Sequence, residues 1–440
     1  MKNVLYLALT WMVSSASWAA TISEVEVRHW YPWQSKVVVD YRLTGNVCAN
    51  VPSGKMVALS LTVKDKVGNV SYTATALTDA DTKRTSWSPF LSGDTGVNEG
   101  MHTVTWDFGS QNVRLRSTNT VFTVAYEDAN PIYCVIDLAK GHNAASFPVH
   151  YLDRMPWDVW PDEYKLSKIV LRRIEPGSFM MLNEASVTLT KPYYIGVYEM
   201  TQKQYYLVTG SNLCADQNSG GYYAGDTRPV GWMTYNLIRG DNLGSNWPTD
   251  IRVDPGSFMG LLRTKTGLPF DLPTESQWEY ACRAGTTSAF NNGGSSEANM
   301  SLVGRWYKNI NDNRGGYGYE GPNGNSVAGF TEVGSYTPNA WGLYDMHGNM
   351  AEWCLDHWCS SYWLSYGTDP QDPKSSFWQS LGSASTQSQY RKLRVVRGGC
   401  YANGSIAELD STARKSYKVG GEGDADDATQ GFRLALTVEK

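Results

Sequence analysis

The stretch Pro338–Asp356, PNAWGLYDMHGNMAEWCLD, combines a dense run of large apolar side chains with a glycine corner. Such side chains are buried in folded proteins, whereas Gly348-Asn349 is typical of a tight turn where φ is positive or a Cβ would clash. Two carboxylates, Asp345 and Glu352, flank this turn. Carboxylate and backbone carbonyl oxygens are the ligands that Ca²⁺ takes in proteins. The stretch therefore has two interpretations, a calcium loop or a buried turn whose carboxylates cap backbone N–H groups.

The N-terminal residues 1–19 have the pattern of a secretory signal peptide. Lys2 precedes an apolar run, and small residues follow it up to Ala19. Because the run is shorter than a membrane-spanning helix and polar sequence follows closely, we expect cleavage after Ala19. No later segment of the sequence is apolar for long enough to cross a bilayer. The mature chain is thus expected to be exported, either to the periplasm or out of the cell.

Composition excludes some classes of function. A length of 440 residues predicts two or three domains. The formal net charge of −5, with no basic stripe, argues against a nucleic-acid-binding protein. The 17 Trp, 27 Tyr and 42 Gly favour a fold with much irregular backbone held by buried aromatic rings. Seven cysteines in an exported chain permit disulfides, but the odd number leaves at least one unpaired and the spacing fixes no pairing.

Residues 20–130 are predicted to form an all-β accessory domain. Runs such as Lys36–Leu43 are rich in β-branched and aromatic residues that alternate with period two, and glycine turn signals separate them. Short strands at this spacing indicate an immunoglobulin-like sandwich. No group of titratable residues gathers in this region. Its Trp30, Trp33 and Trp87 either pack in the core or stack on sugars as an adhesive surface.

Residues 131–168 are predicted to be a connector, because four prolines interrupt any periodicity. The second domain, residues 169–440, opens with strand-like runs and then shows three helix signals. Capping boxes begin helices after Thr201 and Thr274, and a third helix fits Ser257–Thr266. The glycines expected to end these helices are Gly210, Gly285 and Gly267. Beyond them glycine, asparagine and aromatic residues dominate, so we expect long loops ordered by packing, turns and ions.

A set of separate motifs in this second domain resembles one known family. In order along the chain they are Pro192–Thr201, Arg228–Trp232, Leu272–Gly285, Asn339–Trp353, Arg397–Gly399, Ala413–Arg414 and Gly431–Arg433. Together they resemble the formylglycine-generating enzyme, or sulfatase-modifying factor, family over roughly Val170–Leu436. The resemblance implies an α+β, C-type-lectin-like fold with much irregular structure.

The resemblance also bears on the two interpretations of the opening stretch. In the family, the positions that match Asp345 and Glu352 hold a structural Ca²⁺ through their side chains. The positions that match Gly348 and Met350 hold it through their carbonyl oxygens. This favours the calcium interpretation over a metal-free turn.

The family's chemistry is not matched at its reactive positions. Family oxidases bind copper through two cysteines a few residues after the Arg-Gly-Gly motif and convert a substrate cysteine to formylglycine with oxygen. Here Asn403 occupies the first copper-cysteine position, and no cysteine follows Cys400. Cu(I) needs soft thiolate ligands, for which an amide is a poor replacement. Cys400 itself matches the family's active-site serine, and Ala351 matches its tryptophan.

These departures leave competing hypotheses for a pocket formed by Ala351, Cys400, Asn403 and Arg414. In the first, the chain is a calcium-stabilised scaffold without copper that binds a peptide, glycan or protein, or carries out an unidentified reaction. In the second, it is a formylglycine-generating oxidase with an altered copper site. Cys400 is either a catalytic thiol or a buried structural cysteine. The family's Arg397, Arg414 and Arg433 are expected to brace loops through carboxylates and carbonyls.

Overall fold

A computed structural model describes most of the chain. The described residues are 21–31, 36–44, 56–65, 70–74, 77–79, 90–91, 100–108, 120–128, 131–152, 160–216, 224–240, 251–309, 319–320, 326–327, 329–359, 367–371, 375–420 and 429–437. The chain divides into two compact units. The first comprises residues 1–132, 150–154 and 438–440, and the second comprises residues 133–149 and 155–437. The signal segment expected at residues 1–19 lies outside the described residues.

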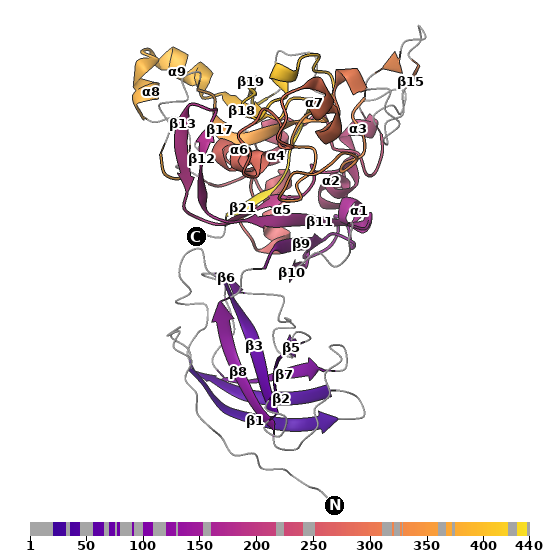
Figure 1. The fold of residues 1–440 in the computed structure, drawn as a ribbon, viewed down its shortest axis with the longest axis vertical. Coiled ribbons are helices and arrows are strands. Elements are labelled where there is room, and N and C mark those ends of the chain that lie inside the picture. The colour runs from indigo at the N-terminus through magenta and orange to yellow at the C-terminus, as the bar shows by residue number, and fades with distance from the viewer. Residues whose placement is uncertain are drawn as a thin grey trace, which may run out of the picture. The chain divides into compact units, whose positions relative to one another are not determined.

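The described residues of the first unit form antiparallel β-structure (Figure 1). Its strands are β1 (Thr21–Tyr31), β2 (Lys36–Thr44), β3 (Met56–Asp65), β4 (Val70–Thr73), β5 (Leu77–Asp79), β6 (Phe90–Leu91), β7 (Gly100–Asp107) and β8 (Thr120–Asp128). One sheet has the order β1-β2-β7-β5, and in the other β3 pairs with β4, β6 and β8. Alternate residues of β2, from Val37 to Leu43, are fully buried, which confirms the period-two pattern. The immunoglobulin-like arrangement stays a prediction.

The remaining strands follow from residue 133 onward. They are β9 (Tyr133–Asp137), β10 (Val149–Leu152), β11 (Lys168–Ile174), β12 (Gly177–Met181), β13 (Ala185–Leu189), β14 (Tyr193–Gly196), β15 (Tyr319–Glu320), β16 (Ser326–Val327), β17 (Ala351–His357), β18 (Leu393–Arg397), β19 (Arg414–Lys418), β20 (Gln430–Gly431) and β21 (Ala435–Thr437). In one sheet β9, β11, β14 and β21 are neighbours in this order, and a second sheet has the order β19-β18-β17-β20. Part of the expected connector is therefore β9, which pairs with β11.

Helices connect and cover these sheets. They are α1 (Glu163–Leu166), α2 (Gln202–Thr209), α3 (Leu213–Asp216), α4 (Tyr235–Arg239), α5 (Phe258–Thr266), α6 (Glu275–Arg283), α7 (Glu297–Val303), α8 (Ser375–Ser380) and α9 (Ala384–Tyr390). Both predicted capping boxes are present, at the start of α2 and of α6, and Ser257 caps α5. Gly210 and Gly267 end their helices in the left-handed conformation as predicted, whereas Ala284, one residue before the expected Gly285, ends α6. No helix that the structure describes is both long and apolar enough to span a bilayer.

Helix α6 positions the candidate site because it contacts both β17 and β18 of the second sheet (Figure 1). The second unit is thus a mixed α/β domain in which short elements alternate with long, ordered loops. Its described cysteines, six residues from Cys134 to Cys400, are all buried, and no two of them form a disulfide.

Candidate functional site

The opening stretch, Pro338–Asp356, folds as a succession of tight turns that ends in β17. Asp345, Gly348 and Asn349 all have positive φ, at 55°, 74° and 57°. A Cβ at Gly348 would overlap the carbonyl oxygen of Arg305, which only glycine avoids. The predicted Gly-Asn corner is therefore confirmed, with both of its predicted causes present. The carboxylates of Asp345, in the turns, and of Glu352, at the start of β17, are both buried.

A buried acidic centre lies at this point. The guanidinium of Arg433 donates to both oxygens of Glu352, from Nε to Oε2 at 2.6 Å and from Nη2 to Oε1 at 2.5 Å. Trp278 Nε1 also donates to Glu352 Oε2, at 2.7 Å. Glu199 and Asp345 complete the group, and each acts electrostatically on Arg433. All three carboxylates and the guanidinium are at most 2 % exposed. We call these four residues, Glu199, Asp345, Glu352 and Arg433, the acidic centre.

The acidic centre carries more negative than positive charge. With all groups ionised, three carboxylates and one guanidinium leave an excess of two negative charges. Burial raises the pKa of Asp345 to about 6, and burial together with the neighbouring carboxylates raises the pKa of Glu199 well above its usual value. Lys165, which is partly exposed, also acts on Asp345. The cause in each case is that low-dielectric surroundings disfavour an ionised carboxylate.

Glu199 is the member of the acidic centre that the sequence did not predict. Its Oε1 accepts from the Met350 N–H at 2.8 Å, and its Oε2 accepts from Asn349 Nδ2 at 2.6 Å. It therefore holds the residues on the C-terminal side of the glycine corner. The signal that could have identified it is that it is the one acidic residue in the otherwise apolar run Tyr193–Met200, where a charge is costly unless it is paired.

One atom of the acidic centre lacks a partner. Asp345 Oδ2 accepts from the Gly334 N–H at 2.6 Å, but Oδ1 is buried and has no hydrogen-bond partner. An orphaned carboxylate oxygen beside excess negative charge suits an oxygen-coordinated cation. Among the residues that the structure describes, no group of three or more His, Cys, Asp and Glu side chains is arranged to hold a metal ion. A cation here would therefore draw on carbonyl oxygens as well, which the family resemblance implies to be those of Gly348 and Met350.

The predicted pocket residues Cys400 and Asn403 lie in one tight turn after β18. Asn403 Oδ1 accepts from the Cys400 N–H at 2.7 Å, and the Asn403 N–H donates back to the Cys400 carbonyl at 3.1 Å. Cys400 is 7 % exposed, and burial raises the pKa of its thiol. At the family's first copper position, the chain thus has an amide that closes a turn. We call residues 398–403 the Cys400 turn.

The other two predicted pocket residues lie on the sheet beside this turn. Ala351 is the first residue of β17, and Arg414 is the first residue of β19, on the far side of β18. Arg414 forms a two-point ion pair with the buried Glu275, with both N–O distances at 2.7 Å. It also donates to the carbonyl of Cys359 at 2.7 Å.

Arg397 also braces the loops around it. It bonds Glu279 and the carbonyls of Ser411, Thr412 and Ala413. Arg414 and Arg433 likewise bond a carboxylate and carbonyl oxygens. The prediction that the three family arginines brace loops is confirmed.

His347, within the stretch Pro338–Asp356, forms a pair with Cys282 that belongs to the buried core. Cys282 Sγ is 3.6 Å from His347 Nε2, which accepts from the Asn291 N–H at 3.2 Å. His347 Nδ1 lies 2.7 Å from the carbonyl oxygen of Leu409, so this nitrogen carries the proton. Burial lowers the pKa of His347 to about 4 and raises that of Cys282 to about 12. Both groups are therefore neutral near pH 7, which suits a core and not a thiolate nucleophile.

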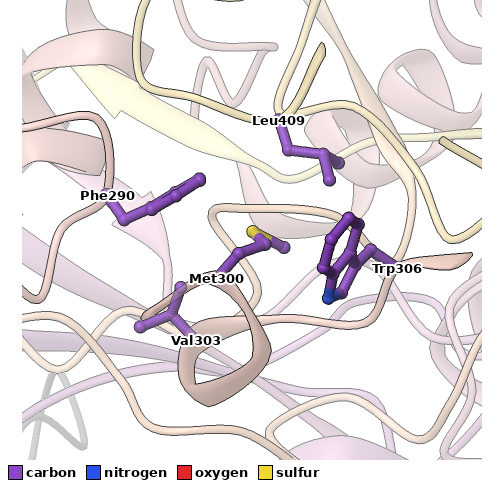
Figure 2. Close-up of a cluster of buried hydrophobic side chains, with 5 residues drawn as sticks. All are labelled: Phe290, Met300, Val303, Trp306 and Leu409. Carbon is purple, nitrogen blue, oxygen red and sulfur yellow. The ribbon is translucent and has the colours of Figure 1, made fainter. Parts of the chain in front are cut away.

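An apolar cluster approaches the Cys400 turn through Leu409, which lies close to Gly399. Figure 2 shows Phe290, Met300, Val303, Trp306 and Leu409 converging on one another. Tyr307, the next residue after Trp306, turns outward and is 55 % exposed. Its backbone N–H donates to the Asn403 carbonyl at 3.3 Å, which places the main chain of this exposed residue beside the Cys400 turn. No sequence signal distinguished Tyr307 from the buried aromatic residues.

Comparison with known proteins places most of the second unit in one family. The profile described as "Sulfatase-modifying factor enzyme 1-like domain" matches residues 163–438, more than half of the chain. The formylglycine-generating enzyme of Streptomyces coelicolor is 31 % identical over 166 residues, which cover 37 % of this chain and 46 % of that enzyme. The enzyme of the same name from Mus musculus is 30 % identical over 130 residues, or 30 % of each chain. The chain thus spans less than half the length of these relatives. Among solved structures, PvdO from Pseudomonas aeruginosa superposes with a TM-score of 0.45 at 22 % identity, covering 64 % of this chain and 99 % of that one.

Proposed function

This chain belongs to the sulfatase-modifying factor enzyme family, and we propose that it is an exported member that binds a ligand without copper chemistry. The observation that carries the proposal is the bond from the Cys400 N–H to Asn403 Oδ1. At the position of a copper thiolate, this chain has an amide that is already committed to a turn. The activity of the related formylglycine-generating enzymes is therefore not transferred. The secretory pattern of residues 1–19 supports export to the periplasm or beyond.

The residues around Cys400 do not fit copper. Cu(I) favours a pair of thiolates, and the six described cysteines are separate, buried thiols. Burial also holds the Cys400 thiol in its protonated form, whereas only the thiolate is a good ligand. We therefore derive no step through copper.

Competition against a chromophoric Cu(I) chelator tests this part of the proposal. We expect the purified chain to leave the Cu(I)–chelator complex intact at equimolar concentration. Stoichiometric withdrawal of Cu(I), abolished in Cys400→Ser, would instead favour the oxidase.

The acidic centre does fit calcium, and we propose Ca²⁺ as a structural ion there. Its ligands would be the side chains of Asp345 and Glu352 and the carbonyls of Gly348 and Met350. The orphaned Asp345 Oδ1, and the presence of three buried carboxylates with a single guanidinium, support this assignment. Both oxygens of Glu352 already accept hydrogen bonds, but a carboxylate offers about four lone-pair sites, so a cation can share it with Arg433. The ion would neutralise the buried charge and fix the corner.

The surface beside the Cys400 turn supplies the proposed binding face. Tyr307 is a large, exposed aromatic residue whose backbone is bonded to the Cys400 turn, and this type of residue is frequent in recognition sites. Its ring faces are suited to stack on a sugar or to pack on a peptide or protein side chain. The flanking ion pairs Lys308–Glu297 and Lys415–Glu408 are each neutral overall, so this face does not select for a strongly charged ligand.

Arrays of glycans and peptides, probed with labelled protein, test the binding face. We expect Tyr307→Ala to lower binding at least about tenfold, which corresponds to about 1.4 kcal/mol. Tyr206→Ala removes another exposed tyrosine, on α2, and serves as the matched control. Equal binding by Tyr307→Ala and the wild type would place the ligand elsewhere.

A further inference from the structure

The glycine corner and the Cys400 turn are joined directly through their main chains. The Gly348 N–H donates to the Gly398 carbonyl at 2.8 Å, and the Tyr401 N–H donates to the Asn349 carbonyl at 2.9 Å. These two bonds lie on either side of Cys400 in the sequence. Gly398 has a positive φ of 87°, so the strand ends here and the turn depends on these bonds for its position. The corner therefore holds the turn on both sides of Cys400.

The side chain of Asn349 connects this clamp to the acidic centre. Its Nδ2 donates to Glu199 Oε2 at 2.6 Å, and its Oδ1 accepts from the Thr331 N–H at 2.9 Å. Its φ of 57° lies in the left-handed region, which asparagine and glycine adopt more readily than other residues. The same residue thus contacts a carboxylate of the acidic centre through its side chain and the Cys400 turn through its carbonyl.

We infer that cation binding at the acidic centre controls the order of the Cys400 turn, with Asn349 as the positioning residue that transmits it. Without the cation, the buried Asp345 Oδ1 stays unpartnered among the carboxylates of the acidic centre, and this loosens the corner that Glu199 holds through Asn349 and Met350. With the cation, the corner is fixed and its two main-chain bonds close the turn over Cys400. This inference rests on the calcium site proposed above and assigns it a regulatory role toward the proposed binding face.

The accessibility of Cys400 reports the state of the turn. The full chain would be alkylated with iodoacetamide in two conditions, saturating Ca²⁺ and chelator. Peptide mass spectrometry would then measure the labelling rate at Cys400 in each condition. We expect Ca²⁺ to slow labelling of Cys400 by about fivefold or more, the effect of a coupling near 1 kcal/mol. The fully buried Cys282 and Cys354 serve as internal controls, because their labelling reports global opening only.

Two variants separate positioning from general stability. Asn349→Gly keeps the backbone conformation and all four proposed calcium ligands but loses the side-chain bonds to Glu199 and Thr331. We expect it to bind Ca²⁺ by calorimetry within about threefold of the wild type, while Cys400 labels at the fast rate whether or not Ca²⁺ is present. Glu297→Gln, an exposed matched control on α7, should keep both the calcium affinity and the Ca²⁺ effect on labelling.

The outcomes distinguish this inference from the calcium site itself. If calorimetry detects Ca²⁺ binding but Cys400 labels equally fast in both states, the coupling is overturned and the site stands. If no Ca²⁺ binds, both fall. If Cys400 does not label in either state, the hydrogen-exchange rate of the Tyr401 backbone amide is measured instead. Exchange at least about threefold slower with Ca²⁺ supports the coupling, and equal exchange rates overturn it.

Discussion

Replacing Arg433 by methionine tests whether its guanidinium balances the negative charge of the carboxylates in the acidic centre. Methionine keeps much of the side-chain volume but removes the charge and every donor. Arg433 is fully buried and donates to both oxygens of Glu352 and to the carbonyls of Gly196 and Tyr344, at 3.0 Å each. The substitution therefore leaves Glu352 without a countercharge and two carbonyl oxygens without this partner.

The expected cost follows from these contacts. Removing one partner of a buried ion pair costs about 3–5 kcal/mol, because the remaining charge stays buried. Losing the bonds to two carbonyls adds about 1 kcal/mol each at most. We therefore expect Arg433→Met to lower the free energy of unfolding by about 4–6 kcal/mol at pH 7.5 in chelator. Added Ca²⁺ should recover part of this loss, because the cation then balances the negative charge of the Glu352 carboxylate.

Guanidinium chloride unfolding, followed by tryptophan fluorescence, measures this difference. Trp278 and Trp353 are buried next to Glu352 and report on the unit that contains the acidic centre. Lys415→Met is the matched control, because the Lys415–Glu408 pair is largely exposed and should cost less than about 1 kcal/mol. If Arg433→Met costs no more than this control, Arg433 does not hold the centre together and the charge account is refuted.

Three further predictions concern the folding of the second unit. Gly348→Ala should cost about 3 kcal/mol in denaturant unfolding, because the new Cβ overlaps the Arg305 carbonyl; Gly267→Ala, with a similar φ of 73° but open space around it, should cost only about 1 kcal/mol, and equal costs would remove the steric argument. His347 has its pKa lowered to about 4, so stability should be full above about pH 6.5 and fall by about 3 kcal/mol as the pH drops to 4. His347→Gln should remove that part of the pH dependence, and an unchanged slope would count against a buried neutral imidazole. Thr274→Ala breaks the capping box of α6 and should lower the unfolding free energy by about 1 kcal/mol, whereas Thr274→Ser should keep most of it.

Local patterns in the sequence predicted local structure well. The capping boxes at Thr201 and Thr274 lie within four residues of the groups they bond, so sequence alone identifies them. The positive φ at Gly348 and Asn349 followed from residue type for the same reason. The family motifs then predicted the extent of the second domain, over roughly Val170–Leu436.

The acidic centre could be predicted only in part, because it is assembled from distant segments. Glu199 meets Asn349 across 150 positions of sequence, and Arg433 meets Glu352 across 81. No local pattern encodes these separations. The exposure of Tyr307 was equally hidden, since its neighbour Trp306 has similar hydropathy and is fully buried. The disulfides that the composition permitted are not formed among the six described cysteines, all of which are buried.

We propose that this chain binds a ligand and has no copper oxidase activity. Turnover of a peptide with the sulfatase motif Cys-x-Pro-x-Arg, in the presence of Cu(I) and oxygen, tests it most directly. Mass spectrometry would follow the substrate cysteine. We predict that the peptide mass stays unchanged by the wild type and by Cys400→Ser alike. Conversion of the cysteine to formylglycine by the wild type, lost in Cys400→Ser, would overturn the proposal and assign the Cys400 thiol to an oxidase site.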